Sequence, residues 1–182
     1  LTLTGSRVRE NTAGEEGGGI WNDDEATLNA SSVTGNTATG SGGGIWTSGH
    51  ITLTRSSVGQ NTAKYGGGIS GKGTLRLQHS SVSENTATLY AGGIDNGRGT
   101  MTLDASDVTR NAAGIGGGGI SNSNLGDIYL INVSTVTANT AYGVPPGGGG
   151  SGGGILNSGW VDASGGIIAG NTPDNCVNRS YP

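Results

Sequence analysis

Apolar residues recur along the chain in short runs that alternate with polar residues. In Ile51-Thr52-Leu53-Thr54, for example, every second side chain is apolar, which is the period of a half-buried strand and not of a helix. Comparable Leu-x-Leu, Ser-x-Val and Gly-Gly-Ile pieces follow one another throughout. The pattern predicts three short strands in each unit, joined by turns in which Gly, Asn, Asp and Ser supply left-handed backbone.

The unit is repeated in tandem. Asn-Thr-Ala, or a close variant, occurs seven times at steps of 25, 25, 24, 26, 28 and 32 residues. A β-branched residue lies three places before each Asn, and a Gly-rich run ending in Ile follows the first six. The seven asparagines are Asn11, Asn36, Asn61, Asn85, Asn111, Asn139 and Asn171. This repeat predicts an all-β fold, a right-handed parallel β-helix of about seven coils of ~25 residues.

We expect one β-helix domain over residues 1–172, followed by a C-terminal tail at 173–182. The distance from Asn to Ile grows to 16 residues between Asn139 and Ile155, which predicts a loop insertion at 142–150. Such a loop is consistent with a functional lid or with a tolerated insertion, and the second is favoured.

Composition alone points elsewhere. Leu, Ile and Val make up only 33 of 182 residues, a fraction typical of disordered chains. A solenoid explains this scarcity, since stacking coils share a continuous core and each needs few inward side chains. The net charge of −4 argues against nucleic-acid binding. No apolar run is long enough to span a bilayer.

The asparagine row predicts an internal ladder, in which side-chain amides of successive coils bond along the axis.

His50 and His79 fall in different rows, so we expect neither a metal site nor a cofactor. The acidic cluster from Glu15 to Glu25 flanks a strand, which favours a solvated surface over a calcium site. Cys176 is the only cysteine, and intermolecular pairing stays open for it.

Two pairs of aromatic residues share rows. Trp21 and Trp46 both follow the repeated Ile, and Tyr65 and Tyr90 both precede it by four residues. Each pair should lie on adjacent coils about 4.8 Å apart, close to stacking distance. Mutual stacking is the favoured interpretation, and binding of a sugar ring or a protein partner is the alternative.

Other candidate chemistry is weaker. Asp95, Asp104 and Asp107 form the best carboxylate cluster, but acid–base catalysis needs paired groups at one place, and we do not expect an enzyme. Outward Ser and Thr residues suggest ice binding as a lesser alternative, although charged residues interrupt the array. Glycosylation sequons occur at Asn29, Asn132 and Asn178.

The unit Leu-Thr-Leu-Thr-Gly-Ser-Arg-Val-Arg-Glu-Asn-Thr-Ala at residues 1–13 resembles repeats of bacterial secreted proteins. The Gly-Gly-Ile pieces are similar to those of polymorphic outer-membrane proteins, and the ending Ile-Ile-Ala-Gly-Asn-Thr at 167–172 resembles the last coil of choice-of-anchor surface proteins. The resemblance implies an extracellular or cell-surface location and a stalk or adhesin role, and it supplies no catalytic motif.

The first predicted strand begins at Leu1, without a helix to cap the coil. Uncapped coils leave strand edges exposed, so we expect either a longer stalk or axial stacking of copies into a fibre. The sequence therefore predicts an extracellular structural or adhesive protein whose partners are further copies, a surface glycan or a protein. A carbohydrate-binding or carbohydrate-active β-helix is the alternative.

Overall fold

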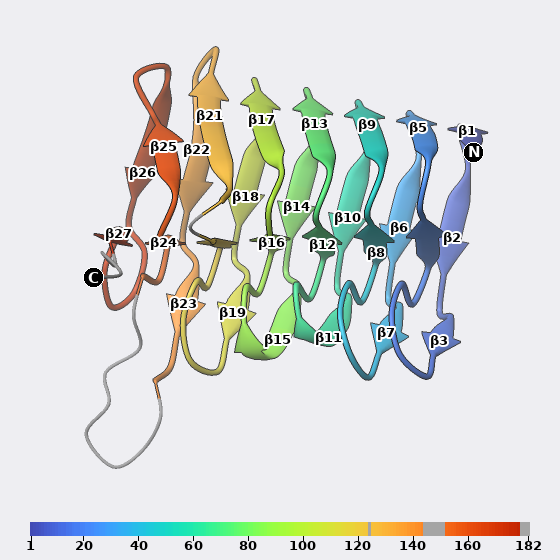
Figure 1. Ribbon diagram of the computed structural model, residues 1–182, viewed down its shortest axis with the longest axis horizontal. Helices are drawn as coiled ribbons and strands as arrows, with labels where there is room; N and C mark the ends of the chain where they lie inside the picture. The colour runs from blue at the N-terminus through green and yellow to red at the C-terminus, as the bar shows by residue number, and fades with distance from the viewer. Residues whose placement is uncertain (124, 144–151, 179–182) are drawn as a thin grey trace.

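The computed structural model describes residues 1–123, 125–143 and 152–178. The chain winds into an elongated parallel β-helix whose coils follow one another along a single axis, with the N- and C-terminal ends far apart (Figure 1). Neighbouring strands pair in parallel, each coil with the next. The predicted all-β solenoid of about seven coils is confirmed.

The strands form four sheets that run the length of the solenoid. Sheet A contains β1 (Thr2–Thr4), β5 (Glu25–Asn29), β9 (His50–Thr54), β13 (Thr74–Gln78), β17 (Thr100–Asp104), β21 (Asp127–Ile131) and β25 (Trp160–Asp162). Sheet B contains β2 (Arg7–Arg9), β6 (Ser32–Thr34), β10 (Ser57–Gly59), β14 (Ser81–Ser83), β18 (Asp107–Thr109), β22 (Ser134–Thr137) and β26 (Gly166–Ala169).

Sheet C contains β3 (Thr12–Ala13), β7 (Thr37–Ala38), β11 (Thr62–Tyr65), β15 (Thr86–Tyr90), β19 (Ala112–Ala113) and β23 (Thr140–Ala141). Sheet D contains β4 (Ile20–Asn22), β8 (Ile45–Thr47), β12 (Ile69–Gly71), β16 (Ile94–Asn96), β20 (Ile120–Asn122), β24 (Ile155–Asn157) and β27 (Cys176–Asn178).

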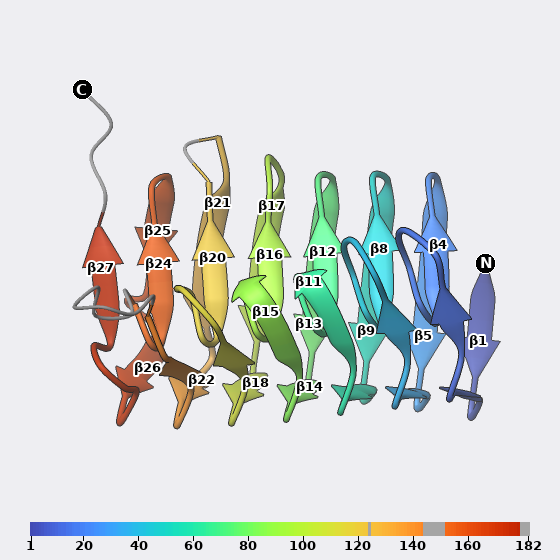
Figure 2. The same ribbon diagram turned by 90° about the horizontal axis from the view of Figure 1, so that it is seen from below.

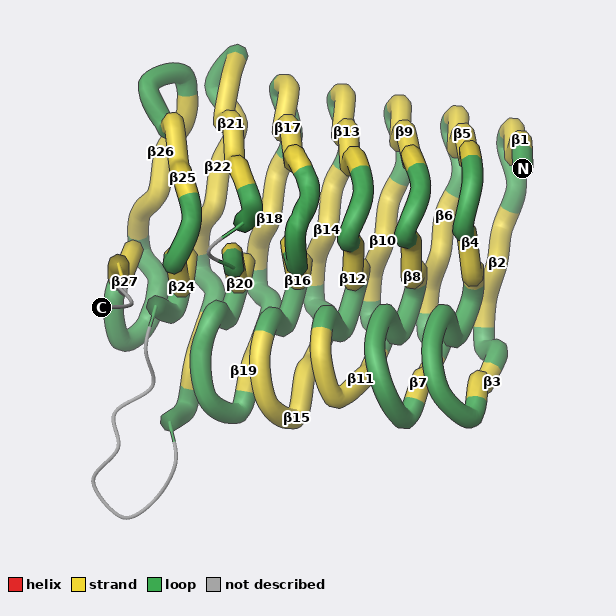
Figure 3. Tube along the Cα trace, viewed as in Figure 1, coloured by secondary structure: helices red, strands yellow, loops and turns green. Residues whose placement is uncertain are grey.

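The three strands predicted for each coil are those of sheets A, B and D. Sheet C is an additional ladder built on the Thr-Ala pair, and four of its strands are only two residues long. Figure 3 shows these short strands as brief yellow segments between loops. A two-residue strand is too short to show the alternation by which the other strands are recognised.

The core is a set of straight columns, one from each inward position of the repeat. Register pairs identical residues, as in Leu53 with Leu77 and Leu103, and all three are fully buried. Burying a leucine of this kind stabilises the fold by roughly 1.5–3 kcal/mol. Stacking therefore allows a chain poor in aliphatic residues to fold.

The predicted asparagine ladder is confirmed. Asn61 Nδ2 donates to Asn85 Oδ1 at 2.9 Å, and the backbone N–H of Asn61 donates to the same oxygen at 3.0 Å. A third bond runs from Asn61 Nδ2 to the carbonyl oxygen of Val33 at 3.0 Å. Equivalent amide–amide bonds of 2.9 or 3.0 Å connect all seven asparagines. Asn171 extends the column to Asn175 at 3.2 Å.

The glycines before each Ile make room for this ladder. A Cβ at Gly68 would lie 2.7 Å from the carbonyl oxygen of Gly93 and 2.9 Å from Asn85 Nδ2. Neither the backbone nor a buried amide held by four hydrogen bonds can move away cheaply. The Asn row and the Gly-Gly-Ile row are therefore two parts of one packing arrangement.

A second polar ladder runs through the corner between sheets A and B. The backbone N–H of Ser56 donates to Ser80 Oγ, and that of Ser80 donates to Ser106 Oγ, both at 3.1 Å. The Ser80 hydroxyl in turn donates to the carbonyl oxygen of Leu53 at 3.1 Å. The buried members are Ser31, Ser56, Ser80, Ser106 and Ser134. At this corner the backbone N–H groups of the serines donate to the serine hydroxyl oxygens of the next coil, in place of a carbonyl oxygen of a neighbouring strand.

A third ladder, also made of asparagines, follows the C-terminal ends of the sheet D strands. Asn96 Nδ2 donates to Asn122 Oδ1 at 2.7 Å, and Asn122 donates to Asn157 at 2.8 Å. Asn157 continues the row to Asn178 at 2.9 Å. Within the described residues, every buried side-chain nitrogen and oxygen has a hydrogen-bond partner.

The expectation that Gly, Asn, Asp or Ser would supply the left-handed corners between sheets A and B holds at Gly5 and Asn132, but it is wrong in the four coils between them. Ala30, Arg55, His79 and Ala105 have φ angles of 47° or 48° there. Bonds between coils hold this backbone: the N–H groups of Arg55 and His79 donate to carbonyl oxygens of the next coil at 2.9 Å. These contacts offset the cost of about 1–2 kcal/mol that a left-handed L-residue incurs.

The segment after residue 172 is more than a tail, because β27 pairs in parallel with β24. The solenoid therefore extends past the predicted boundary. The rest of the predicted tail, residues 179–182, and most of the insertion at 142–150 lie outside the described residues. Nowhere in the described ranges is there a helix long and apolar enough to cross a bilayer.

Candidate functional site

The outward face of sheet D carries the most distinctive surface of the solenoid. Figure 2 views the molecule from a side on which β4, β8, β12, β16, β20 and β24 lie next to one another. The central residues of these strands form one row by register: Trp21 beside Trp46, then Ser70, Asp95 and Ser121. We call this the sheet D row.

The predicted tryptophan pair is stacked. The ring centroids of Trp21 and Trp46 are 5.3 Å apart and the ring planes differ by 9°. Trp46 is 8% exposed, whereas Trp21 is 54% exposed. The pair therefore combines an inner ring that stabilises the row with an outer ring whose surface is open to a ligand.

Two lysines lie over these aromatic groups. Lys72 Nζ is 5.8 Å from the centroid of the Trp46 ring, and Lys64 Nζ is 5.6 Å from that of Tyr65. Tyr65 stacks in turn on Tyr90, with centroids 6.5 Å apart and planes 5° apart. Each predicted aromatic pair thus also has a cation–π contact, which rigidifies the pair and places a positive charge beside it.

Asp95 is the titratable group of the sheet D row. Burial raises the pKa of its carboxyl to about 6, while the Ser70 hydroxyl and the positive charge of Lys72 act in the opposite direction. Ser70 Oγ donates to Asp95 Oδ2 at 3.3 Å. The row therefore holds a partly buried carboxylate two coils from the tryptophan pair, with Ser70 on the coil between them.

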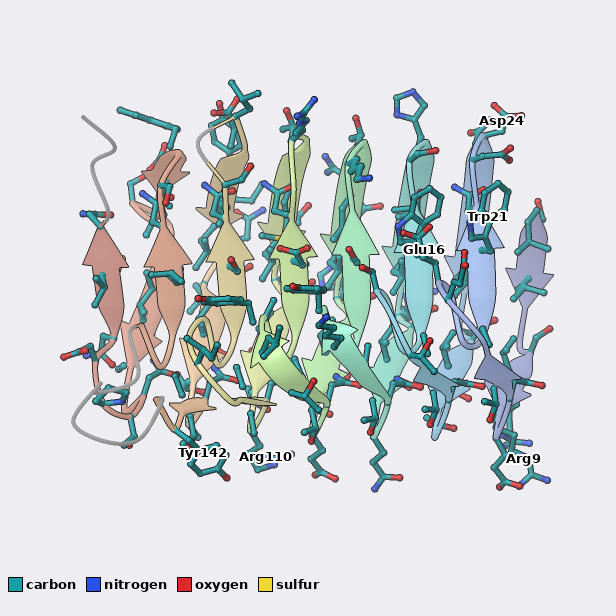
Figure 4. The ribbon with its side chains drawn as sticks, turned by 60° about the horizontal axis from the view of Figure 1, so that its bottom comes forward. Arg9, Glu16, Trp21, Asp24, Arg110 and Tyr142 are labelled. Atoms are coloured by element: carbon teal, nitrogen blue, oxygen red, sulfur yellow. The ribbon has the colours of Figure 1, made fainter. Side chains whose placement is uncertain are left out.

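Two acidic side chains lie on the same face as the exposed tryptophan. Figure 4 shows Glu16 and Asp24 on the same face as Trp21, whereas Arg9 and Arg110 project from the opposite edge. Across the described ranges, no three His, Cys, Asp or Glu side chains come together in a way that could hold a metal ion. Glu16 and Asp24 thus form an acidic rim at one end of the row.

The three carboxylates singled out as a cluster lie in different sheets. Asp95 is in β16, Asp104 ends β17 and Asp107 begins β18. Asp104 accepts hydrogen bonds from Asn132 Nδ2 at 2.6 Å and Arg76 Nη2 at 3.2 Å. The Asn132 bond is the main reason that the pKa of Asp104 lies below its usual value. Each of the three carboxylates therefore bonds to its own neighbours, and they do not form the paired acids that acid–base catalysis needs.

The sequons coincide with the polar ladders. Ser31 and Ser134, the hydroxyl residues of the Asn29 and Asn132 sequons, belong to the buried serine ladder. Asn178 accepts the last bond of the sheet D ladder, and the rest of its sequon lies outside the described residues. Ser31, Ser134 and Asn178 therefore have structural roles in the ladders, and glycosylation at the three sequons stays a prediction.

The repeat itself has a known counterpart. A family model of the Chlamydia polymorphic membrane protein repeat matches residues 30–48. No curated protein and no solved structure matches the chain.

The match confirms the resemblance to polymorphic membrane protein repeats. Its residues run from Ala30 at the corner before β6, through β7, to the end of β8. This stretch contains Asn36 of the ladder and the Gly-Gly-Ile piece that packs on it. What the polymorphic membrane protein repeat shares with this chain is thus the ladder unit, and Trp46 of the sheet D row lies within it.

Proposed function

We propose that this chain is a rigid, non-enzymatic β-helix on a bacterial surface or outer membrane, where it has a structural or adhesive role. The polymorphic membrane protein repeat at residues 30–48 supports the location. The continuous asparagine column supports the structural role, since it ties every coil to the next and makes the solenoid a stiff spacer.

Antibody labelling tests the location. Antibodies raised against the purified chain should stain intact cells of the source organism as strongly as permeabilised cells. Staining that appears only after permeabilisation would overturn the surface assignment.

Adhesion through the sheet D row is the second part of the proposal. It is supported by the exposed ring of Trp21, which lies flat on Trp46 beside an acidic rim. Aromatic platforms of this kind bind sugar rings and protein hot spots. The labelled protein should bind glycans on an array or cultured cells, and Trp21→Ala should abolish this binding. Trp160→Ala, at an exposed tryptophan in sheet A, is the matched control. Retention of binding by Trp21→Ala would contradict the assignment.

Axial association is the third part. Leu3 and Val8 in the first coil and Val161 and Ile168 in the last belong to the inward rows but are only partly buried. Further coils or a second copy of the chain would cover these edges equally well. Electron microscopy of the purified chain should show filaments at high protein concentration, and strictly monomeric particles would count against stacking of copies.

The non-enzymatic assignment has a direct test as well. Incubation with a panel of polysaccharides should release no reducing sugar above the level of an inert protein. Sustained turnover that is lost in Asp95→Asn would replace the structural role with a carbohydrate-active one.

A further inference from the structure

A polar hollow lies at the corner between sheets A and B, in the middle of the solenoid. Its lining residues come after β9, β13 and β17, whose C-terminal ends lie at the upper edge of Figure 1, and its volume is about 370 Å³. Its walls come from three successive coils and include Arg55, Ser57, His79, Ser81, Ala105 and Asp107. It lies on different sheets from the aromatic rows and far from both ends of the chain.

The sequence of the corner explains why the hollow forms there. The same position is Ala30, Arg55, His79 and Ala105 in four successive coils, all with left-handed backbone. Arg55 and His79 therefore stand as two long, exposed side chains between two small ones. The small side chain of Ala105 leaves the space that the hollow occupies beside His79.

Four of the side chains that line the hollow have no hydrogen-bond partner within the described residues, unlike Ser56 and Ser80, whose hydroxyls donate to carbonyl oxygens. Arg55, His79 and the hydroxyls of Ser57 and Ser81 make no side-chain hydrogen bond or ion pair there. Two other arginines do have partners: Arg76 pairs with Asp104 at 3.2 Å and Arg110 with Glu84 at 3.3 Å. Ser57 and Ser81 are register partners, so their hydroxyls lie one coil apart, about 4.8 Å.

The opposite end of the hollow presents a hydrogen-bond acceptor, the carboxylate of Asp107. Asp107 lines it, and one of its oxygens accepts the Thr135 hydroxyl at 2.6 Å. Its other oxygen is free of hydrogen bonds within the described part of the chain. The hollow thus presents cationic and hydroxyl donors on two coils and a carboxylate on the third.

We propose that this hollow binds a carboxylated sugar, a uronic acid being the simplest example. The planar guanidinium of Arg55 can take a carboxylate through two parallel hydrogen bonds. Ser57, Ser81 and Asp107 can then exchange hydrogen bonds with the ring hydroxyls. The negative charge of Asp107 repels a ligand whose charge is spread over all its oxygens, such as inorganic phosphate. The volume lies at the lower end of the range of small-molecule sites, which suits one or two sugar rings.

This assignment goes beyond the proposed surface role and does not depend on it. The sheet D row offers an aromatic platform with an acidic rim, which suits a different ligand. The two sites can therefore be separated by mutation.

Titration followed by ¹H–¹⁵N NMR tests the proposal. D-glucuronate should shift the backbone amides of residues 55–57 and 79–81 saturably, whereas D-glucose and acetate should shift them far less. Arg55→Gly should weaken glucuronate binding by about tenfold or more, the value of a lost charge-assisted hydrogen bond. Glycine suits the left-handed backbone at this position, so the variant should fold.

Two further variants keep the test decisive. Gln60→Gly makes the same backbone change at the corner between sheets B and C, where φ is 57°, and should bind glucuronate like the wild type. Arg55→Gln keeps a long polar side chain but removes the positive charge and the guanidinium that can form two parallel hydrogen bonds. It should also weaken binding. The proposal is overturned if glucuronate leaves these amides unchanged, if both Arg55 variants bind normally, or if acetate binds as tightly as glucuronate.

Discussion

Asn61 and Asn85 lie in neighbouring coils, and the side-chain amide of the first donates to the side-chain oxygen of the second at 2.9 Å. Both are fully buried. Because the same bond recurs from coil to coil, the register of the solenoid and the spacing of Asn-Thr-Ala in the sequence have one cause.

Replacing Asn61 by alanine should therefore destabilise the fold. The change removes the acceptor used by both the side-chain amide and the backbone N–H of Asn36. Buried donors left without a partner cost about 1–3 kcal/mol each. Thermal unfolding should show a clear drop in Tm, whereas Gln60→Ala on the exposed corner should change it little. An unchanged Tm in Asn61→Ala would contradict a structural role.

Gly68→Ala should be as damaging as loss of an asparagine. The added methyl group would lie 2.9 Å from Asn85 Nδ2, so the coil must either open or lose a ladder bond. We expect a loss of about 2 kcal/mol or more in the free energy of unfolding, within the range of overpacked cores. Gly14→Ala is the matched control, because a Cβ there meets nothing within 4 Å. Equal stability of the two variants would show that the glycines do not serve the ladder.

Asp95→Asn should make the protein more stable at neutral pH. Burial raises the pKa of Asp95 from 3.8 to about 6, so the folded state favours the protonated acid. The stability linked to this group is fully present below pH 3.8 and is lost as pH rises through about 6. The gain should be at most about 3 kcal/mol, since one pKa unit is about 1.4 kcal/mol. It should vanish below pH 3.8.

Chemical denaturation across this pH range measures the effect. Asp23→Asn, on the exposed turn after β4, should show no comparable gain. A wild-type protein that is more stable than Asp95→Asn at neutral pH would show that the ionised carboxylate is favoured in the fold.

The two stacked tryptophans should differ in their effect on stability. Trp46→Ala removes a buried ring and should cost about 3 kcal/mol, the lower part of the range for buried aromatic residues. Trp21→Ala removes a ring that is half exposed and should cost about 1 kcal/mol, chiefly the stacking term. Urea denaturation of both variants measures the difference. Equal losses would contradict the asymmetric burial of the pair.

Much of this fold could be predicted because every coil repeats the same information. The Leu, Val and Ile rows and the Asn row recur seven times or nearly so, which identifies inward positions without any knowledge of the structure. The aromatic stacks were also predictable, since Trp21 and Trp46 occupy the same place in adjacent repeats. The register between the two coils then places one ring beside the other.

Other features were missed for physical reasons. Ser56 and Ser80 read as turn residues, because a polar residue next to a strand gives no sign that its hydroxyl is buried. Arg55 and His79 are 24 residues apart in the sequence and have different chemistry, so no motif joins them. Only the coil places them side by side at one hollow. Left-handed backbone at Ala30, Arg55, His79 and Ala105 was not predicted, because bonds between coils outweigh the local preference of these residue types.

The most direct test of the central claim, that a buried asparagine column joins the coils, is hydrogen exchange of the side-chain amides followed by NMR. The account predicts that the Nδ2 protons of Asn36, Asn61, Asn85 and Asn111 exchange orders of magnitude more slowly than those of an unstructured peptide. They should be as protected as the backbone amides of sheet A. Exchange of these protons at the unstructured rate, in an otherwise folded protein, would contradict it.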